Sequence, residues 1–248
     1  MSLDYSSFTH VYLYGTCVVD LAFAEAGIHA TEVLESLGLK VVYVEDQSCC
    51  GQPAYTSGFE QEAATVAAQQ AALFPEPWPV VVLSGSCAGM MKHHYPRLLG
   101  DSAQIFSQKV IEWSEFVFNH PNFHWPDTDT VEKVVLHTSC TARREMGTFE
   151  TVSRALQQAP GASVQTHVRE SECCGFGGTF AVRHKEISTA MVSDKCDAIL
   201  AQNPDALVSA DCACMLNING HLSWRGEALA GMHIASWVHQ QLQQAGQL

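Results

Sequence analysis

The sequence carries the same pattern of cysteines twice, and this repeat limits the possible folds more than any other feature. The matching segments are HVYLYGTC at 10–17 and KVVLHTSC at 133–140, VVYVEDQSCCGQP at 41–53 and VQTHVRESECCGFG at 164–177, and PVVVLSGSC at 79–87 and PDALVSADC at 204–212. Their cysteines are separated by 123, 124 and 125 residues. Three matches at so constant an offset indicate an internal duplication.

Each half of the duplication alternates strands with helices. The Pro-rich stretch HPNFHWPDTD at 120–129 predicts the boundary, which gives a first cysteine-rich unit over 1–125 and a second over 126–248. In the first unit the expected strands are 10–14, 39–45 and 79–84, and the expected helical stretches are 20–38 and roughly 58–74. Strands that alternate with helices form parallel βαβ units. The predicted fold class is therefore α/β, with two duplicated Rossmann-like units related by a pseudo-two-fold axis.

The cysteines of both units follow directly after predicted strands. They are Cys17, Cys49, Cys50 and Cys87 in the first unit and Cys140, Cys173, Cys174 and Cys212 in the second. In open α/β sheets, ligands bind outside the carboxyl ends of the strands, so we expect four thiols to converge at one edge of each unit. A single cysteine is usually a small buried hydrophobic residue. Eight cysteines at equivalent strand ends in two copies indicate metal ligation instead.

Two further cysteines lie outside this pattern. Cys214 follows Cys212 in ADCACMLNING, so either residue, or both, could supply the last ligand of the second unit. Cys196 lies in the helical sequence MVSDKCDAIL and has no counterpart in the first unit. We expect Cys196 to be a packed or surface thiol and not a ligand.

Cysteine ligands are compatible with zinc or with an iron–sulfur cluster. Thiolates bind both, but the closely spaced pairs of Cys-x-x-Cys motifs that are usual in structural zinc sites are absent. Glycines adjoin both cysteine pairs, at Gly51, Gly175, Gly177 and Gly178, and their backbone N–H groups could reach bridging sulfides. An ordinary tight turn explains these glycines equally well.

Composition narrows the functional class. Ten cysteines in 248 residues, without an apparent signal sequence, are expected to be free thiols in a reducing compartment. No apolar run approaches the length of about 20 residues that a spanning helix needs, so we expect no direct membrane insertion. Thirteen Lys and Arg against 26 Asp and Glu give a net charge of −13, which argues against a nucleic-acid surface and favours a basic partner.

The chain resembles the CCG (cysteine-rich) domain family over essentially its whole length. The motifs that carry the resemblance are YLYGTCVVD, CCGQPAYTSG, SGSCAGM, LHTSC, CCGFGGTFAV, ADCACMLNING and GMHIASW. That family includes the B subunit of heterodisulfide reductase and the iron–sulfur subunit of glycolate oxidase. Within it, the chain is most similar to the lactate utilization protein A family, whose members contain two CCG units. The resemblance implies one or two [4Fe-4S] clusters, with zinc as the alternative metal.

The clusters of heterodisulfide reductase are non-cubane and have five cysteines each, which the first unit of this chain does not match. Met90 stands where the first unit would need its fifth cysteine, whereas the second unit could supply five if Cys212 and Cys214 both bind.

The resemblance also implies a function. It indicates an iron–sulfur oxidoreductase subunit that relays single electrons in a bacterial complex oxidising L-lactate to pyruvate. Two partner proteins are expected, one of them an iron–sulfur electron carrier. The implied location is the cytoplasm, with any membrane association made through a partner.

Two residues beside Cys140 are candidates for contact with a small 2-hydroxy acid substrate. Arg143 could bind a carboxylate, and His137 could act as a base near a hydroxyl. The first unit has Tyr14 and Asp20 at the matching places, so the units differ where chemistry would require it. A histidine satisfied by the backbone and an arginine on a solvated helix are the alternatives.

Two other functions remain open at this point. The chain could be a zinc-stabilised scaffold without redox activity, or a thiol–disulfide reductase of the heterodisulfide type that uses its cysteine pairs directly. If the duplicated units pack about a pseudo-two-fold axis, their cysteines should face one shared cleft between them.

Overall fold

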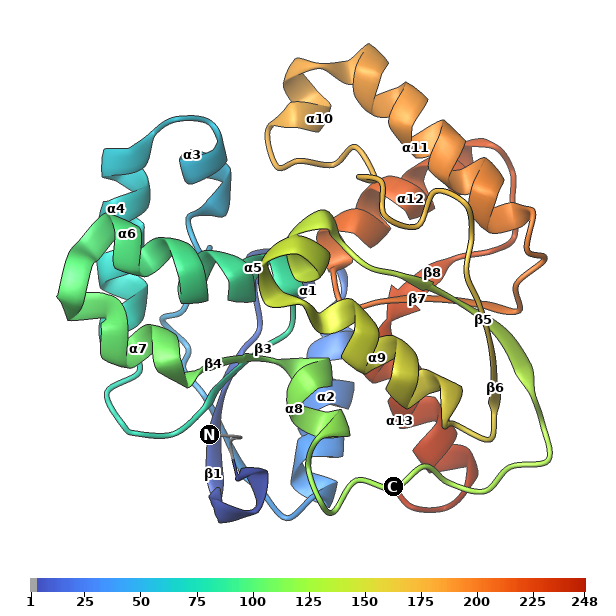
Figure 1. The fold of residues 1–248 in the computed structure, drawn as a ribbon, viewed down its shortest axis with the longest axis horizontal. Helices are drawn as coiled ribbons and strands as arrows, with labels where there is room; N and C mark the ends of the chain where they lie inside the picture. The colour runs from blue at the N-terminus through green and yellow to red at the C-terminus, as the bar shows by residue number, and fades with distance from the viewer. Residues whose placement is uncertain (1–3) are drawn as a thin grey trace.

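The computed structural model describes residues 4–248 and contains two four-stranded sheets, one in each half of the chain (Figure 1). The first sheet consists of β1 (His10–Tyr14), β2 (Lys40–Tyr43), β3 (Val80–Val82) and β4 (Val110–Glu112). The second consists of β5 (Glu132–His137), β6 (Ala162–Gln165), β7 (Ala206–Ser209) and β8 (Gly231–His233). All strands run parallel, in the order β2-β1-β3-β4 and β6-β5-β7-β8. The predicted α/β fold of two equivalent parallel units is confirmed.

The helices of the two units follow a similar order, except between the third and fourth strands, where the first unit has five helical segments and the second has one. Those of the first are α1 (Cys17–Ala22), α2 (Ala24–Ser36), α3 (Gln52–Thr56), α4 (Glu60–Ala72), α5 (Gly85–Gly89), α6 (Tyr95–Leu99), α7 (Gln104–Lys109) and α8 (Trp113–Phe118), with short turns η1 (Tyr5–Ser7), η2 (Met90–His94) and η3 (Gly100–Ala103). Those of the second are η4 (Ala142–Met146), α9 (Thr148–Gln157), α10 (Phe180–Arg183), α11 (Lys185–Leu200), α12 (Cys212–Trp224) and α13 (Ile234–Gln244). Within residues 4–248, no helix has the length and apolar character that crossing a membrane requires.

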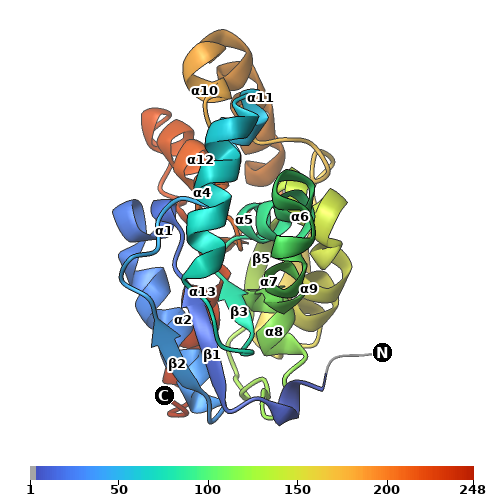
Figure 2. The same ribbon diagram turned by 90° about the vertical axis from the view of Figure 1, so that its left-hand side faces the viewer.

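The inner strands β1, β3, β5 and β7 are largely buried, which is why they appear as apolar runs in the sequence, whereas the edge strands β2 and β6 are partly exposed. On the outer face of the first sheet, Ala63 and Ala67 of α4 pack against Val80 and Val82. Figure 2 shows α4 lying across this sheet. The helical stretch expected over 20–38 is divided in two, because Phe23 has a non-helical backbone and its N–H closes α1 on the carbonyl of Val19.

The two units pack through equivalent elements. Helix α2 packs on α13 and α8 on α9, while α1 packs on α12 and α5 on η4. A two-fold rotation that exchanges the units turns the α2–α13 contact into the α9–α8 contact, and the α1–α12 contact into the η4–α5 contact. The predicted pseudo-symmetry requires such pairs. Figure 1 shows α2, α8, α9 and α13 between the sheets, and the core there contains Val81 and Trp113 together with Val208 and Trp237. The exact division of the chain at residues 125 and 126 stays our proposal.

Glu112 ends β4, caps α8 and is fully buried, which gives a test of the fold. Burial raises the pKa of its carboxyl to about 8, although hydrogen bonds from Ser114 and Glu115 oppose the shift. Between pH 4.5 and 8 the unfolded chain therefore releases a proton that the folded chain keeps, so stability falls as pH rises. We expect Glu112→Gln to reduce the fall in the free energy of unfolding over this pH range by on the order of 3 kcal/mol. Urea unfolding at pH 5 and pH 8 measures it, and parallel pH profiles for the two proteins would contradict it.

Candidate metal centre

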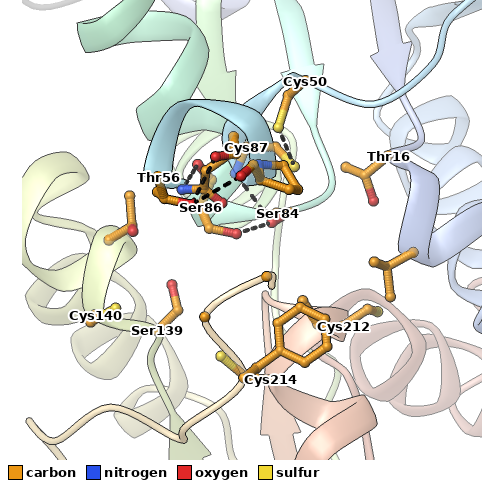
Figure 3. Close-up of a pocket in the computed structure, with 18 of the residues that line it drawn as sticks. Thr16, Cys50, Thr56, Ser84, Ser86, Cys87, Ser139, Cys140, Cys212 and Cys214 are labelled. Atoms are coloured by element: carbon orange, nitrogen blue, oxygen red, sulfur yellow. Dashed lines mark hydrogen bonds between the residues drawn. The ribbon is translucent and has the colours of Figure 1, made fainter. Parts of the chain in front are cut away.

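A cavity of about 220 Å³ lies between the two units, beyond the carboxyl ends of their strands. Nine cysteines line it, namely Cys17, Cys49, Cys50, Cys87, Cys140, Cys173, Cys174, Cys212 and Cys214. Hydroxyl groups complete much of the wall, from Thr16, Thr56, Ser84, Ser86, Ser139 and Thr141. Figure 3 shows Cys50 and Cys87 facing Cys212 and Cys214 across this space. The expectation of one shared cleft is confirmed.

In the first unit four thiols form a contiguous group, which we call the first cysteine set (Cys17, Cys49, Cys50 and Cys87). Cys17 begins α1, the pair lies between β2 and α3, and Cys87 lies in the first turn of α5. The Sγ atoms of Cys50 and Cys87 are 3.3 Å apart. Hydrogen bonds from Cys17 and from Cys50 lower the pKa of Cys49 to about 3. Of the four thiols, Cys49 is therefore the one whose thiolate form these contacts favour.

The second unit has an equivalent group, the second cysteine set (Cys140, Cys173, Cys174 and Cys214). Cys140 is hydrogen-bonded to Cys173, and this bond, with burial, raises the pKa of Cys140. Cys174 is hydrogen-bonded to both Cys173 and Cys214. The two sets thus have the same connectivity, with the cysteine pair in the middle and single cysteines from the other two strand ends on either side.

The strand register identifies Cys214, and not Cys212, as the counterpart of Cys87. Tyr12 pairs with Val80 in the first sheet, and the equivalent pair in the second sheet is Val135 and Leu207. Cys87 follows Val80 by seven residues, as Cys214 follows Leu207. Each cysteine is also the third residue of its helix. The sequence match that aligned Cys87 with Cys212 is therefore wrong by two residues.

The same register changes the interpretation of Met90, whose counterpart is Asn217. Met90 is fully buried in the core of the first unit, and neither unit has a cysteine at this position. The residue equivalent to Cys212 is Gly85. A Cβ atom on Gly85 would lie 2.5 Å from the Cβ of Ala142. The first unit therefore has no room for a fifth cysteine there, because α5 and η4 approach closely at Gly85.

Cys212 faces the first cysteine set. Residues two apart on a helix point about 200° apart, so Cys212 and Cys214 at the start of α12 cannot face the same side. Figure 3 shows their sulfur atoms directed differently. Cys212 belongs to the core shared by both sheets, as does Val19 of α1, whereas Cys214 belongs to the core of the second unit. Burial, Asp211 and then Cys87 raise the pKa of Cys212, so Cys87 of the other unit is close enough to interact with it.

Asp211 joins the two units beside the cavity and was missed by sequence reasoning. It is the N-cap of α12, and its Oδ1 accepts from the Ser84 hydroxyl at 2.6 Å and from the Ser86 hydroxyl at 2.5 Å. Asp211 is 1% exposed, and its Oδ2 has no hydrogen-bond partner within residues 4–248. In the sequence, only the position of Asp211 directly before Cys212 could have indicated that it lies beside the cavity.

The predicted glycines lie around both cysteine pairs. Gly51 and Gly175 follow the pairs with φ of +83° and +85°, and the Gly175 N–H donates to the Sγ of Cys173 at 3.4 Å. Gly177 and Gly178 line the cavity, where Gly178 lies against Pro53 of the first unit. The role of these four glycines in holding a cofactor stays a prediction.

The two residues proposed for substrate contact do not line the cavity. Arg143 forms an ion pair with Glu170, and its guanidinium carbon lies 3.8 Å from the centre of the Phe149 ring. His137 lies beneath the second cysteine set, with a ring nitrogen within 4.8 Å of the sulfurs of Cys174 and Cys214. Burial lowers the pKa of His137 to about 3, and neither ring nitrogen has a hydrogen-bond partner among the described residues. A catalytic role for either residue stays a prediction.

A buried pair of equivalent polar residues, Gln70 on α4 and Lys195 on α11, also escaped the sequence reasoning. Each bonds to the backbone just before a cysteine pair, Gln70 at Ser48 and Lys195 at Glu172. Lys195 lies three residues after Val192 on the buried stripe of α11. A lysine on an apolar stripe was the signal that could have identified it.

Comparison with known proteins places this arrangement in a family. The cysteine-rich CCG domain model matches twice, at residues 11–92 and 134–219. Lactate utilization protein A of Geobacillus sp. (strain WCH70) is 37% identical over 231 residues, which cover 91% of this chain and 97% of that protein. The chain belongs to the lactate utilization protein A family. A second member, lactate utilization protein A 1 of Bacillus mycoides (strain KBAB4), is 35% identical over 95% of this chain and 99% of its own length.

A solved structure resembles the family fold seen here. The crystal structure of a hypothetical protein from Helicobacter pylori matches 96% of this chain with a TM-score of 0.62 and 11% sequence identity. The chain spans about half the length of that protein, 51%, so the likeness concerns the fold alone.

Proposed function

We propose that the chain is an iron–sulfur subunit of a system that oxidises lactate to pyruvate, and that it relays electrons between two cysteine-ligated clusters. One observation carries the proposal: cysteines from the equivalent strand ends of both units line a single cavity. The names of its relatives supply the link to lactate. The proposed substrate-level step, lactate to pyruvate with release of two electrons and two protons, takes place on a partner, because His137 and Arg143 lie outside the cavity wall.

The donor set fits an iron–sulfur group. In each unit hydrogen bonds link four thiols in a row, and thiolates are the ligands that such clusters require. We assign the first cysteine set to one [4Fe-4S] cluster and the second set to another. Cys212 lies between them and faces Cys87, so we propose it as a fifth thiolate for the first site. Such a cluster supplies one-electron redox chemistry when bound.

The chain itself contributes burial, charge and backbone donors. Cys50, Cys87, Cys174 and Cys214 are all less than a tenth exposed, which excludes water from the inner side of each set. The N–H of Gly175 donates to Cys173, and hydrogen bonds of this kind stabilise the negative charge on sulfur. The start of α12 carries both Cys212 and Cys214, where the helix dipole also favours thiolate.

The proposed partners follow from the electron count. Lactate oxidation yields two electrons, whereas a cluster passes one at a time, so the relay needs a two-electron oxidation site and an electron carrier in other chains. We propose two partner subunits, one of them an iron–sulfur carrier, in the cytoplasm. The net charge of −13 favours a basic docking face on the partner, with association that weakens as salt increases.

Anaerobic purification with iron and sulfide counting tests the proposal. Two clusters predict about eight iron and eight sulfide atoms per chain, with absorption near about 400 nm. Zinc without sulfide would instead support a zinc scaffold, which the His137, Cys174 and Cys214 group favours because zinc accepts mixed histidine and cysteine ligands. Activity that survives complete removal of metal would support a thiol–disulfide reductase.

A further inference from the structure

Lys195 is a charged side chain buried behind the second cysteine set. The residue is 1% exposed. Its Nζ donates to the backbone carbonyl of Arg169, to that of Glu170 at 3.2 Å and to that of Glu172 at 2.8 Å. An ammonium group has three donors, whereas a neutral amine has two, so three carbonyl acceptors match the charged form. The backbone thus holds a positive charge in the interior.

These bonds place the charge beside the second CCG segment. Glu172 directly precedes Cys173, so Lys195 anchors the loop that presents the cysteine pair. Lys195 is close enough to interact electrostatically with Cys174, Cys214 and Cys173. Lys195 therefore brings a positive charge to this set.

The first unit does the same structural task without a charge. Gln70 on α4 is 3% exposed, and its Oε1 accepts from the Ser48 N–H at 2.9 Å. Its Nε2 donates to the Ser48 hydroxyl at 3.0 Å. Ser48 precedes Cys49 as Glu172 precedes Cys173, so Gln70 and Lys195 anchor equivalent loops. The two cysteine sets are alike in their thiols, and Lys195 gives the second set a buried positive charge that the first set lacks.

We infer that Lys195 makes the second cysteine set the stronger cation site of the two and, on the proposed function, the place where a shared electron resides. Lys195 repels the cation itself, but four thiolates around a divalent cation leave a centre that is more negative than the free set of thiols, so a nearby positive charge favours the metal-bound state. Reduction makes that centre more negative still. A nearby positive charge therefore stabilises the reduced form more than the oxidised form. In the relay the first site gives up one electron, the second site accepts it, and no other reactant takes part.

The first test uses cobalt(II) and needs no iron. In a Cys50→Ser background, which leaves only the second set complete, cobalt–thiolate absorption reports binding to that set. We expect Lys195→Gln to weaken cobalt binding about tenfold and Lys195→Arg to keep it near the original value, since arginine retains the charge. Lys109→Gln is the control, because Lys109 also donates to carbonyls, at Phe74 and Glu76, but belongs to α7 of the first unit.

The second test measures the reduction potentials of the anaerobic protein by spectroscopic titration. Lys195→Gln should lower the potential of the second site by about 59 mV, which is a tenfold change for one electron. Unchanged cobalt binding in folded Lys195→Gln, or an equal loss in Lys195→Arg, would overturn the inference. Should Lys195→Gln not fold, Gln70→Lys in a Cys174→Ser background takes its place: tenfold tighter cobalt binding supports the inference and no gain overturns it. A protein that gives the cobalt result but never binds iron and sulfide contradicts the proposed function alone.

Discussion

Replacing Cys174 with serine is expected to remove the metal from the second cysteine set and to leave the first set filled. Cys174 is the central residue of its set, with hydrogen bonds to both Cys173 and Cys214, and it is 2% exposed. A serine oxygen is a hard donor that replaces a soft thiolate poorly. We expect about half of the bound metal to be lost, and metal analysis with visible absorption measures this. Cys50→Ser should remove the other half.

Cys196→Ser is the matched control for this experiment. Cys196 is as buried as Cys174, but it lies on α11 away from the cavity wall. We expect no change in metal content from this substitution. Cys212→Ser adds a sharper comparison, because Cys212 faces Cys87 and should weaken the first site, although its sequence position assigns it to the second unit. Loss of metal in Cys196→Ser, or loss confined to the second site in Cys212→Ser, would contradict the assignment.

The sequence predicted the strands well where burial produces a clear run of apolar residues. β1 occupies 10–14 as expected, and β2 and β3 fall inside their expected ranges. β1 and β3 are buried almost throughout and need apolar residues at nearly every position, whereas β2 is a partly exposed edge strand. The last strand of each sheet was not foreseen. β4 (VIE) and β8 (GMH) are three residues long, and they are strands only because β3 and β7 offer them a partner. That information is tertiary and is absent from any local pattern.

The nine cysteines of the cavity could be assigned to it from the sequence, because they follow strands and parallel strands end at the same edge of a sheet. The equivalence of Cys87 and Cys214 could not, because the register of α12 depends on where its N-cap, Asp211, lies relative to β7. The charge difference between Gln70 and Lys195 was also hidden, since both residues occur in ordinary helical sequence. Only packing shows that their polar ends reach the loops before the cysteine pairs.

Replacing Gly175 with alanine is expected to destabilise the second unit strongly and to release its metal. Gly175 has φ of +85°, which costs an alanine about 1–2 kcal/mol. Its new Cβ would also lie 2.8 Å from the backbone carbonyl oxygen of Ser188, an atom that a side-chain rotation cannot move. The Ser188 hydroxyl in turn donates to the Gly175 carbonyl at 2.8 Å, so the clash opens the contact between the CCG loop and α11. We expect a total loss of about 3 kcal/mol or more in urea unfolding.

Two other glycines separate backbone strain from this clash. Gly58 has the same φ of +85° with no atom within 4 Å of an added Cβ, so Gly58→Ala should show the strain alone, about 1–2 kcal/mol. Gly51, which follows the first cysteine pair as Gly175 follows the second, has its nearest neighbour at 3.4 Å, a side-chain atom of Val66. Gly51→Ala should therefore resemble Gly58→Ala in stability and keep its metal. Equal losses in Gly51→Ala and Gly175→Ala would show that the two CCG loops are held alike, and that the contact with Ser188 does not fix the position of the second cysteine pair.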